Sequence, residues 1–355
     1  MKKVPVEDAV GMVLGHDITK IVPGEFKGRA FKKGHIIQKE DIAELLKLGK
    51  EHIYVWEQSF GELHEDEAAL RIAAAVAGEN VEYTEPKEGK TTLKAKIKGL
   101  FKVNSQLLYE INSIEYISIA SLPGNFPVEE GQGLAGARII PLMIEGSKVE
   151  EVERLCREKG FAFEVLEYKK LKAALIVTGN EIYRGRIEDK FTPVLLKKLN
   201  YFEADYLGRT FCPDSVEEIT RAILEYKKQG ADLILLTGGM SVDPDDLTPS
   251  AIRKSGAQVV TYGAPVQPGN MFMLAYLDSA TLMGVPGCAM YYKTTILDAI
   301  LPRVFAGQTL TKEDFVKMGE GGFCLNCDSC RYPNCFFCIG GRNVFHHQFP
   351  IVYRK

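Results

Sequence analysis

Short apolar runs that end in glycine-containing turns are the clearest feature in the pattern of hydrophobic and polar positions along this chain. They cover residues 174–177, 233–236 and 280–283, and longer amphipathic stretches separate them. Unbroken apolar runs of this length are typical of strands that are buried on both faces of a parallel sheet. The pattern therefore predicts an α/β domain over residues 171–308, built on a mostly parallel sheet. Its helices are expected near residues 189–200, 214–229, 246–255 and 289–304.

The rest of the chain divides into segments with more mixed patterns. Residues 1–58 combine strand signals with a helix signal near residues 40–48, and residues 59–170 mix short strand and helix signals. Such a mixture is typical of small α+β modules. Residues 309–355 form a tail whose strong feature is a cluster of cysteines. We therefore expect smaller α+β modules before the α/β domain and a cysteine-rich tail after it.

The composition limits the choice of partners and of cellular compartment. The chain of 355 residues has 44 basic and 47 acidic residues, and its net charge of -3 provides no overall attraction to nucleic acid or to an anionic membrane. No stretch is apolar over the length that spans a bilayer, and the first residues lack the apolar core of a signal peptide. We expect a cytoplasmic protein with neither nucleic acid nor membrane among its partners.

The glycine-containing turns follow the predicted strands, at the edge where open parallel sheets bind their ligands. They read Thr-Gly-Asn-Glu at 178–181, Gly-Gly-Met-Ser at 238–241 and Pro-Gly-Cys at 286–288, and a similar Pro-Gly-Asn turn occupies 268–270. Glycine allows backbone N–H groups to approach an anion, and the helix that follows adds the positive end of its dipole. Together the turns predict a domain that binds a phosphorylated or otherwise anionic small molecule.

Acidic side chains gather at two of these turns. Asp243, Asp245 and Asp246 lie within four positions, and carboxylates at that density repel one another unless a cation lies between them. Glu181 and Asp189 belong to the first turn and to the helix start after it. Carboxylates beside a phosphate site predict Mg²⁺ as the bridging ion. The alternative is that Glu181 is solvated and that Asp189 and Asp246 only cap helices.

Five of the eight cysteines fall within 15 residues in the last segment. Four thiolates are enough to hold Zn²⁺ or an iron–sulfur cluster. In a reducing compartment such spacing favours metal or redox chemistry over disulfides. The alternative is a tail of free thiols without structure. The predicted ligands are Cys324, Cys327, Cys330, Cys335 and Cys338.

The turns resemble the motifs of the molybdopterin-binding domain family, which includes molybdopterin adenylyltransferases, molybdopterin molybdotransferases and gephyrin. Residues 9–18 and 31–49 are similar to the opening of the molybdotransferases. The resemblance implies a three-layer α/β/α domain, preceded in residues 1–58 by a molybdotransferase-like segment. The motifs that carry it are Thr178-Gly179-Asn180-Glu181, Gly238-Gly239-Met240-Ser241 with Asp245-Asp246, Pro268-Gly269-Asn270 and Pro286-Gly287-Cys288.

The resemblance also implies a ligand, partners and site residues. It implies that molybdopterin and Mg²⁺ are bound, that ATP and molybdate take part, that a molybdoenzyme receives the product, and that the chain forms homo-oligomers. The implied catalytic residues are Glu181, Asp245 and Asp246, and the implied Mg²⁺ ligands are Glu181, Asp189 and Asp246. The implied pterin-binding residues are Thr178, Gly179, Asn180, Gly238, Gly239, Ser241, Thr248, Pro268, Gly269, Asn270, Pro286 and Gly287.

The sequence also departs from the family, and the departures leave its reaction open. We find no Ser-x-x-Asp-Gly-(Tyr/Phe)-Ala motif, whose acid helps to build the molybdate site of the molybdotransferases, and Asn180 and Asn270 stand where the family has aspartate and lysine. One hypothesis is Mg²⁺-dependent adenylyl or molybdate transfer to the pterin. Another is a non-catalytic carrier or maturation factor whose cysteines hold or deliver molybdenum or sulfur. A third, a nucleotide-binding regulatory module, accounts for the glycine turns but for neither the acidic cluster nor the cysteines.

Overall fold

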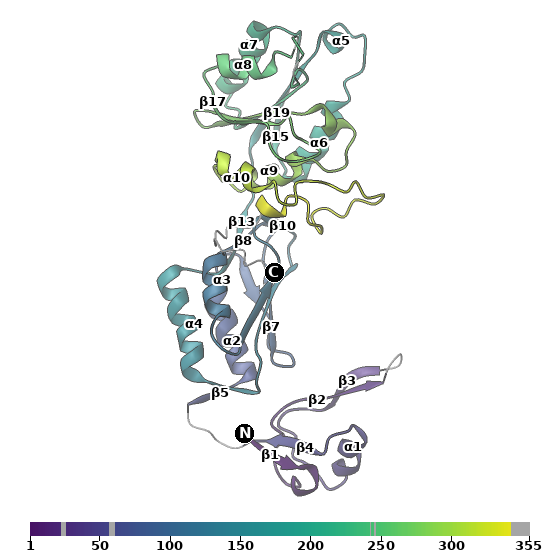
Figure 1. Ribbon diagram of the computed structural model, residues 1–355, viewed down its shortest axis with the longest axis vertical. Helices are drawn as coiled ribbons and strands as arrows, with labels where there is room; N and C mark the ends of the chain where they lie inside the picture. The colour runs from purple at the N-terminus through teal and green to yellow at the C-terminus, as the bar shows by residue number, and fades with distance from the viewer. Residues whose placement is uncertain (23–25, 57–60, 242, 245, 342–355) are drawn as a thin grey trace, which may run out of the picture.

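The computed structural model describes residues 1–22, 26–56, 61–241, 243–244 and 246–341 of the chain. In Figure 1 the α/β domain lies at the top, a middle α+β module lies below it, and the amino-terminal module lies at the bottom. Each of these parts has buried apolar residues that form a core of its own. Among the described helices, none is long and apolar enough to cross a membrane.

The sheet of the α/β domain has, within the described residues, the strand order β15-β14-β16-β19-β18-β17. The predicted apolar runs form the central strands β14, β16 and β19, whose side chains are almost all buried. These strands and β15 run parallel, whereas β18 and β17 are antiparallel, which confirms a mostly parallel sheet. The bounds are β14 (Lys172–Thr178), β15 (Asp205–Cys212), β16 (Leu233–Thr237), β17 (Gln258–Tyr262), β18 (Met273–Leu277) and β19 (Ala280–Val285).

Helices cover both faces of this sheet, because alternate residues of each strand point to opposite faces. Ala174 and Ile176 share a core with α7 and α8, whereas Ala173 and Leu175 share a core with α6 and α9. The domain is therefore a three-layer α/β/α sandwich, as expected. The helices are α5 (Asn180–Tyr183), α6 (Phe191–Tyr201), α7 (Val216–Lys228), α8 (Thr248–Lys254) and α9 (Ile296–Phe305).

The last predicted helix of this domain, over residues 289–304, is wrong at its start. After β19 the chain forms the 3-10 turn η2 (Gly287–Met290), and α9 begins only at Ile296. The physical reason is a capping box, in which the Thr295 side chain and the Asp298 side chain satisfy each other's backbone N–H groups. Residues 291–293 consequently lie outside the helix, where they can line the cavities described below.

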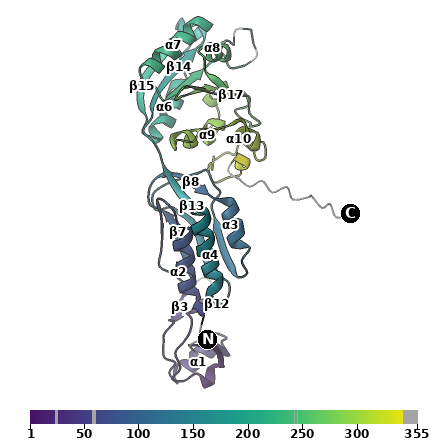
Figure 2. The same ribbon diagram turned by 90° about the vertical axis from the view of Figure 1, so that its left-hand side faces the viewer.

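The middle module packs helices against antiparallel strands. Its strands pair in the orders β6-β7-β11-β9 and β10-β8-β13, with a separate β12-β5 pair. Figure 2 shows α2 and α4 side by side along this module. The elements are β5 (Glu62–His64), α2 (Glu65–Val76), β6 (Val81–Tyr83), β7 (Lys90–Ala95), β8 (Gly99–Val103), α3 (Ser105–Asn112), β9 (Ile117–Ser121), β10 (Phe126–Val128), β11 (Gly133–Ile139), β12 (Met143–Glu145), α4 (Gly146–Lys159) and β13 (Phe163–Glu167).

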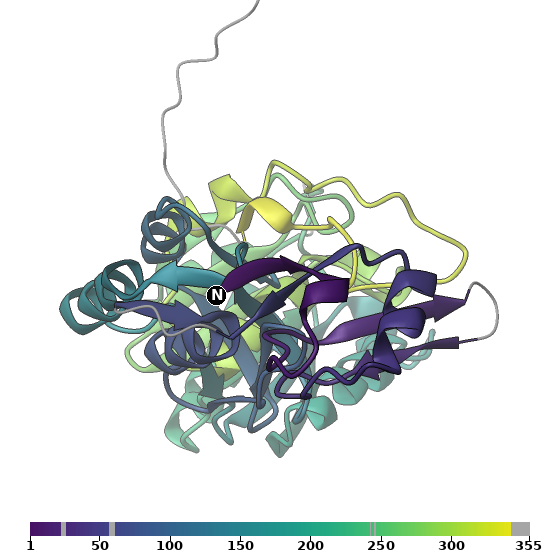
Figure 3. The same cartoon turned by 90° about the horizontal axis from the view of Figure 1, so that it is seen from below.

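The amino-terminal module has a small core that includes Val6, Leu14, Ile37 and Leu45. The strand pair β2-β3 extends sideways from it in the view from below (Figure 3). The elements are β1 (Lys2–Pro5), η1 (Val6–Asp8), β2 (Ile18–Val22), β3 (Phe26–Phe31), α1 (Asp41–Lys47) and β4 (His52–Val55).

Residues 309–341, which contain the cysteine cluster, pack against the α/β domain. Phe315 of α10 (Lys312–Lys317) is buried in the same core as α6 and α9, and so are Phe337 and Cys338. In Figure 1, α10 and η3 (Ile339–Gly341) lie between the sheet of the α/β domain and strands β8 and β13. The cysteine segment is therefore held close to the carboxyl half of the α/β domain.

Candidate functional site

Several of the predicted turns meet in a cavity of about 580 Å³ at the carboxyl ends of β16 and β19. The loop before β18 supplies the remaining wall. The predicted site residues that line this cavity are Gly238, Gly239, Ser241, Asp246, Pro268, Gly269, Asn270, Pro286 and Gly287. The structure thus brings together residues that are far apart in the sequence. The wall also contains Met240, Gln267, Met271, Cys288 and Tyr292, which were not predicted as site residues.

The glycine pair at the end of β16 is fixed against the end of β14. A Cβ atom on Gly238, whose φ is +84°, would lie 2.2 Å from the carbonyl oxygen of Thr178. Thr248 Oγ1 donates a hydrogen bond to the carbonyl oxygen of Gly238 at 2.8 Å and lies 3.2 Å from Thr178 Oγ1. Thr178 and Thr248 therefore support the turn from behind, and only glycine fits between them and the cavity.

Tyr262 holds the next part of the same turn from the far end of the sheet. Its hydroxyl group donates to the carbonyl oxygens of Met240 at 3.0 Å and Ser241 at 3.1 Å. Burial and the nearby Asp246 carboxylate raise the pKa of Tyr262, so the phenol stays protonated and can donate these bonds. No pattern in the sequence indicated this contact, because β17 and the turn are separated along the chain.

Asp246 is the acidic group of the second turn that lines the cavity. One of its carboxylate oxygens accepts a hydrogen bond from the backbone N–H of Asp243 at 3.0 Å. This contact closes the acidic turn locally and leaves the side chain half-buried at the cavity wall. Asp245, which was predicted as a catalytic residue, lies outside the described residues.

The first turn, which contains Gly179, Asn180 and Glu181, is organised by a residue that was not predicted. The backbone N–H of Asn180 donates to Asp214 Oδ2 at 2.9 Å, and Asn180 Oδ1 accepts from the N–H of Asp214 at 3.4 Å. The Glu181 carboxylate folds back over Gly179, so that a Cβ atom there would lie 2.9 Å from Glu181 Oε1. Asp214 thus places a carboxylate beside this turn, and a second one at position 180 would repel it.

Asp189 caps helix α6. Its carboxylate accepts hydrogen bonds from the backbone N–H groups of Phe191 at 2.9 Å and Thr192 at 3.1 Å, and from the Thr192 hydroxyl group. Arg209 pairs with it at 3.3 Å. These contacts match the alternative in which Asp189 serves as a helix cap, and Asp189 is not among the residues that line the cavity.

Metal ligands are not pre-assembled in the described part of the chain. Nowhere in it do three or more His, Cys, Asp or Glu side chains come close enough to hold a metal ion. Glu181, Asp189 and Asp246 therefore do not form a ready cage for Mg²⁺. Neither do Cys324, Cys327, Cys330, Cys335 and Cys338 form one for Zn²⁺ or an iron–sulfur cluster.

The Pro-Gly loop at 267–270 connects the cavity to the cysteine segment. Gln267 N–H donates to the carbonyl oxygen of Gly322, and Cys324 N–H donates to that of Gln267, each at 2.8 Å. The Asn270 amide donates to the carbonyl oxygen of Ala264 at 2.7 Å and so closes its own loop. Cys288 also lines the cavity, and burial raises the pKa of its thiol. The cavity wall therefore contains one thiol, and Gln267 on that wall is hydrogen-bonded to the cysteine segment.

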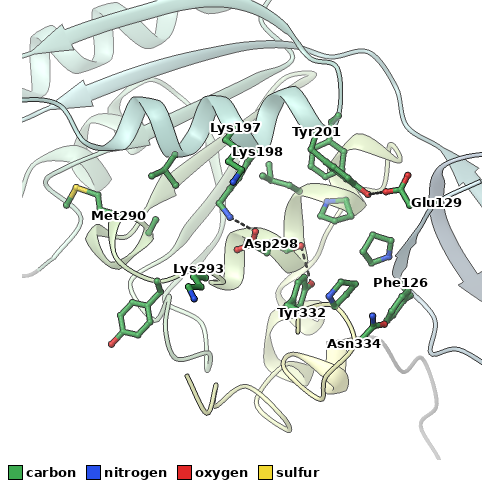
Figure 4. Close-up of a pocket in the computed structure, with 18 of the residues that line it drawn as sticks. Phe126, Glu129, Lys197, Lys198, Tyr201, Met290, Lys293, Asp298, Tyr332 and Asn334 are labelled. Atoms are coloured by element: carbon green, nitrogen blue, oxygen red, sulfur yellow. Dashed lines mark hydrogen bonds and ion pairs between the residues drawn. The ribbon is translucent and has the colours of Figure 1, made fainter. Parts of the chain in front are cut away.

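A second cavity, of about 690 Å³, lies between α6, α9, the middle module and the cysteine segment (Figure 4). Many of the polar groups on its wall form hydrogen bonds or ion pairs with one another. Tyr201 donates to Glu129 at 2.8 Å, Tyr332 donates to the carbonyl oxygen of Asp298 at 3.2 Å, and Lys198 pairs with Asp298. These contacts join three parts of the chain. Tyr292 lines both cavities, so the two lie next to each other.

Two stretches of the chain match models of protein families. Residues 174–306 match the family described as "Probable molybdopterin binding domain". Residues 3–57 match the family described as "Domain of unknown function (DUF8806)". The first match coincides with the part of the fold that carries the glycine-containing turns.

Individual relatives are similar to this chain over part of their length. The chain is 31% identical over 150 residues to a molybdopterin molybdenumtransferase of Haemophilus influenzae, and this match covers 40% of this chain and 36% of the relative. It is 24% identical over 174 residues to the molybdopterin molybdenumtransferase of Synechococcus elongatus, and that match covers 46% of this chain and 43% of the relative. The chain thus spans less than half of these relatives. The solved structure of the molybdopterin biosynthesis MoeA protein from Pyrococcus horikosii shows 14% identity and a TM-score of 0.32, covering 86% of this chain and 74% of that protein.

Proposed function

Since residues 174–306 belong to the molybdopterin-binding domain family, we propose that this chain binds molybdopterin during molybdenum cofactor biosynthesis. The cavity of about 580 Å³ at the glycine-containing turns is the proposed pterin site. One observation carries the proposal: Gly238-Gly239, Pro268-Gly269 and Pro286-Gly287, which the resemblance implied as binding residues, line the same cavity as Asp246, which it implied as a catalytic residue and Mg²⁺ ligand.

The cavity suits an anionic ligand that carries a phosphate group. Gly238 and Gly239 have positive φ values of 84° and 54°, and without side chains they allow their backbone N–H groups to approach an anion in the cavity closely. Ser241 adds a hydroxyl group, and Pro286 and Gly287 lead into the 3-10 turn η2. These groups would hold the phosphate, while the apolar wall at Met240 and Tyr292 would contact the pterin ring.

The chemistry of this site fits Mg²⁺ in the way that proteins usually hold it with phosphates. Mg²⁺ is commonly bound by one or two carboxylates, by phosphate oxygens of the substrate and by water, and so needs no complete protein cage. Asp246 lies on the cavity wall and Glu181 lies at the neighbouring first turn. We assign these two acids to the metal, which when bound supplies positive charge to phosphate oxygens. Transfer of an adenylyl group or of molybdate to the pterin is the proposed reaction.

A second candidate function is that of a non-catalytic carrier or maturation factor for a molybdoenzyme. It is favoured by the backbone pairing of Gln267 with the cysteine segment and by the thiol of Cys288 on the cavity wall. Thiolates are soft ligands that bind soft metal ions, zinc and iron–sulfur clusters. In this function the cysteine segment would hold the metal next to the bound pterin.

Anaerobic titration with molybdopterin, with and without Mg²⁺-ATP, tests both candidates when the pterin products are separated by chromatography. We expect saturable binding, because the lining groups complement a phosphorylated ligand. An adenylylated product would support the transferase. The same protein is also mixed with adenylylated pterin and molybdate. Binding of the pterin without conversion, both in this mixture and with Mg²⁺-ATP, would support the carrier. Absence of binding by the folded protein would contradict both.

The cysteine segment is expected to take up metal when the protein is prepared without oxygen. We predict roughly one Zn²⁺ ion or iron–sulfur centre per chain, since four thiolates complete such a site. Metal analysis and visible absorption would measure it. A Cys327→Ser and Cys330→Ser double variant should lose the metal, and a Cys156→Ser variant, altered in α4 of the middle module, should keep it. Equal metal content in both variants would contradict the prediction.

A further inference from the structure

A group of cationic side chains surrounds a cavity of about 370 Å³ that is separate from the pterin site. It lies where β8 of the middle module meets α9, α10 and η3, which are stacked directly above β8 in Figure 1. Lys102, Arg303 and Lys317 line it, and among the described residues Asp314 is the one carboxylate on its wall. The described walls of this cavity and of the pterin cavity have no residue in common.

Arg303 is the deepest of these cations, with only 6% of its surface exposed. Its Nε donates to Gln308 Oε1 at 2.8 Å and its Nη2 donates to Asp314 Oδ1 at 2.6 Å. The remaining nitrogen, Nη1, is buried and makes no hydrogen bond within the part of the chain that the structure describes. A buried charged donor without an acceptor is unfavourable. The arrangement therefore lacks an acceptor at this point.

Lys102 faces the same cavity from β8. Its Nζ donates to Asn125 Oδ1 at 2.7 Å, and the Asn125 amide donates to the carbonyl oxygen of Gly341 at 3.2 Å. Burial and the charge of Arg303 lower the pKa of Lys102 to about 8, although Glu164, its partner on β13, acts in the opposite direction. Asp314 also raises this pKa, and Lys317 pairs with Glu313 at 3.0 Å. Even so, Lys102 and Arg303, from different parts of the chain, are held near enough to each other for the charge of Arg303 to lower the pKa of Lys102.

We propose that this cavity binds a tetrahedral oxyanion, of the class that includes phosphate, sulfate and molybdate. Its oxygens would accept hydrogen bonds from Arg303, Lys102 and Lys317, and Thr309 adds a hydroxyl group to the wall. An anion there would place negative charge beside the Arg303 guanidinium and the Lys102 ammonium group, and so offset the repulsion between these cations. Because Lys102 and Arg303 come from the middle module and the α/β domain, the anion would also connect these two parts. The proposal does not depend on pterin binding.

Binding of sodium phosphate, sulfate and molybdate to the full-length protein, measured by calorimetry and by thermal unfolding, tests this proposal. Sodium chloride at matched ionic strength is the control for general salt effects. We expect saturable binding of the oxyanions and a rise in the unfolding temperature that chloride does not produce. An effect equal to that of chloride for all of the oxyanions would overturn the proposal.

Variants locate the site. Lys102→Gln keeps a donor for Asn125 but removes the charge, and is expected to weaken oxyanion binding by about tenfold or more, a loss within the range for a charge-assisted bond. Lys312→Gln, on α10 but not on the cavity wall, should bind the anion as the parent protein does. Equal affinities of the two variants would also overturn the proposal.

The three anions distinguish the possible sources of the ligand. Similar affinities for phosphate, sulfate and molybdate would support a general oxyanion site. A preference for molybdate of about tenfold or more would support a site that holds the oxyanion needed for molybdenum transfer. The readout is binding rather than turnover, so its failure would leave the proposed pterin site untouched.

Discussion

Replacement of Gly238 by alanine is expected to abolish molybdopterin binding and to lower the free energy of unfolding by about 2 to 5 kcal/mol. The new Cβ atom would lie 2.2 Å from the carbonyl oxygen of Thr178, so β14 and the turn after β16 cannot both keep their positions. A positive φ of 84° adds backbone strain for any L-residue. Urea unfolding measures the stability, and the pterin titration measures the binding.

Gly160→Ala is a matched control, because Gly160 has a φ of +85° and no described atom lies within 4 Å of a Cβ built there. With a ψ of -162°, it lies in a backbone region that is almost exclusive to glycine, so the variant carries backbone strain without the steric overlap. We expect a loss of about 1 to 3 kcal/mol and unchanged pterin binding. If the two variants lost the same stability and both bound the pterin, the proposed role of the glycine turn would be wrong.

Asp246→Asn is expected to reduce Mg²⁺-dependent turnover by about a hundredfold or more while the fold remains stable. Asparagine retains an oxygen that can accept the hydrogen bond from the N–H of Asp243, so the turn keeps its local support. What is lost is the negative charge on the cavity wall, which would hold the cation beside the phosphate. Steady-state assays over a range of Mg²⁺ concentrations would measure the loss, and urea unfolding would measure the stability.

Asp243→Asn provides the comparison for this charge. Asp243 is exposed in the same turn, but it is not among the residues that line the cavity. Its replacement should change turnover by no more than about threefold, because an exposed charge is screened by solvent. Similar losses in the two variants would indicate a general effect of the acidic turn and would contradict a specific role of Asp246.

The architecture of the α/β domain could be predicted from its sequence because the strands β14, β16 and β19 are buried on both faces. That burial produces unbroken apolar runs, and it also places the turns after them at one edge of the sheet. The start of α9 could not be predicted in the same way. Residues 289–292 are apolar or aromatic and follow a Pro-Gly turn, so they resemble a helix start, whereas the Thr295–Asp298 capping box places the start of α9 at Ile296.

Local motifs indicated part of the cavity wall, whereas contacts between distant segments were not indicated. The Gly238–Gly239 pair, Asp246 and the Pro-Gly turns line the cavity, but the equally local predicted residues Thr178, Gly179, Asn180, Glu181 and Thr248 are not among its lining residues. Asp214, Tyr262 and Tyr292 reach their positions only through the packing of the sheet, so no spacing in the sequence indicated them.

The cysteine cluster shows a different limit of sequence patterns. The spacing of these residues gives the number of thiols that could act as ligands, but it does not determine which of them face solvent. Cys338 is buried with Phe337 in the core below α9, whereas Cys327, Cys330 and Cys335 are exposed. Whether the thiols can converge on one ion depends on how this segment packs, and no rule of spacing contains that information.

Two backbone hydrogen bonds join Gln267, on the wall of the cavity at the glycine-containing turns, to Gly322 and Cys324 of the cysteine segment. Two ligands that each order the same pair of backbone hydrogen bonds cannot bind independently. Once the first ligand has ordered that pair, the second ligand binds without the entropic cost of ordering it. If the cysteines take up metal as proposed, metal uptake and occupancy of the cavity would therefore be thermodynamically linked. This linkage is reciprocal. If bound metal increases the affinity for the pterin by a certain factor, bound pterin increases the affinity for the metal by the same factor.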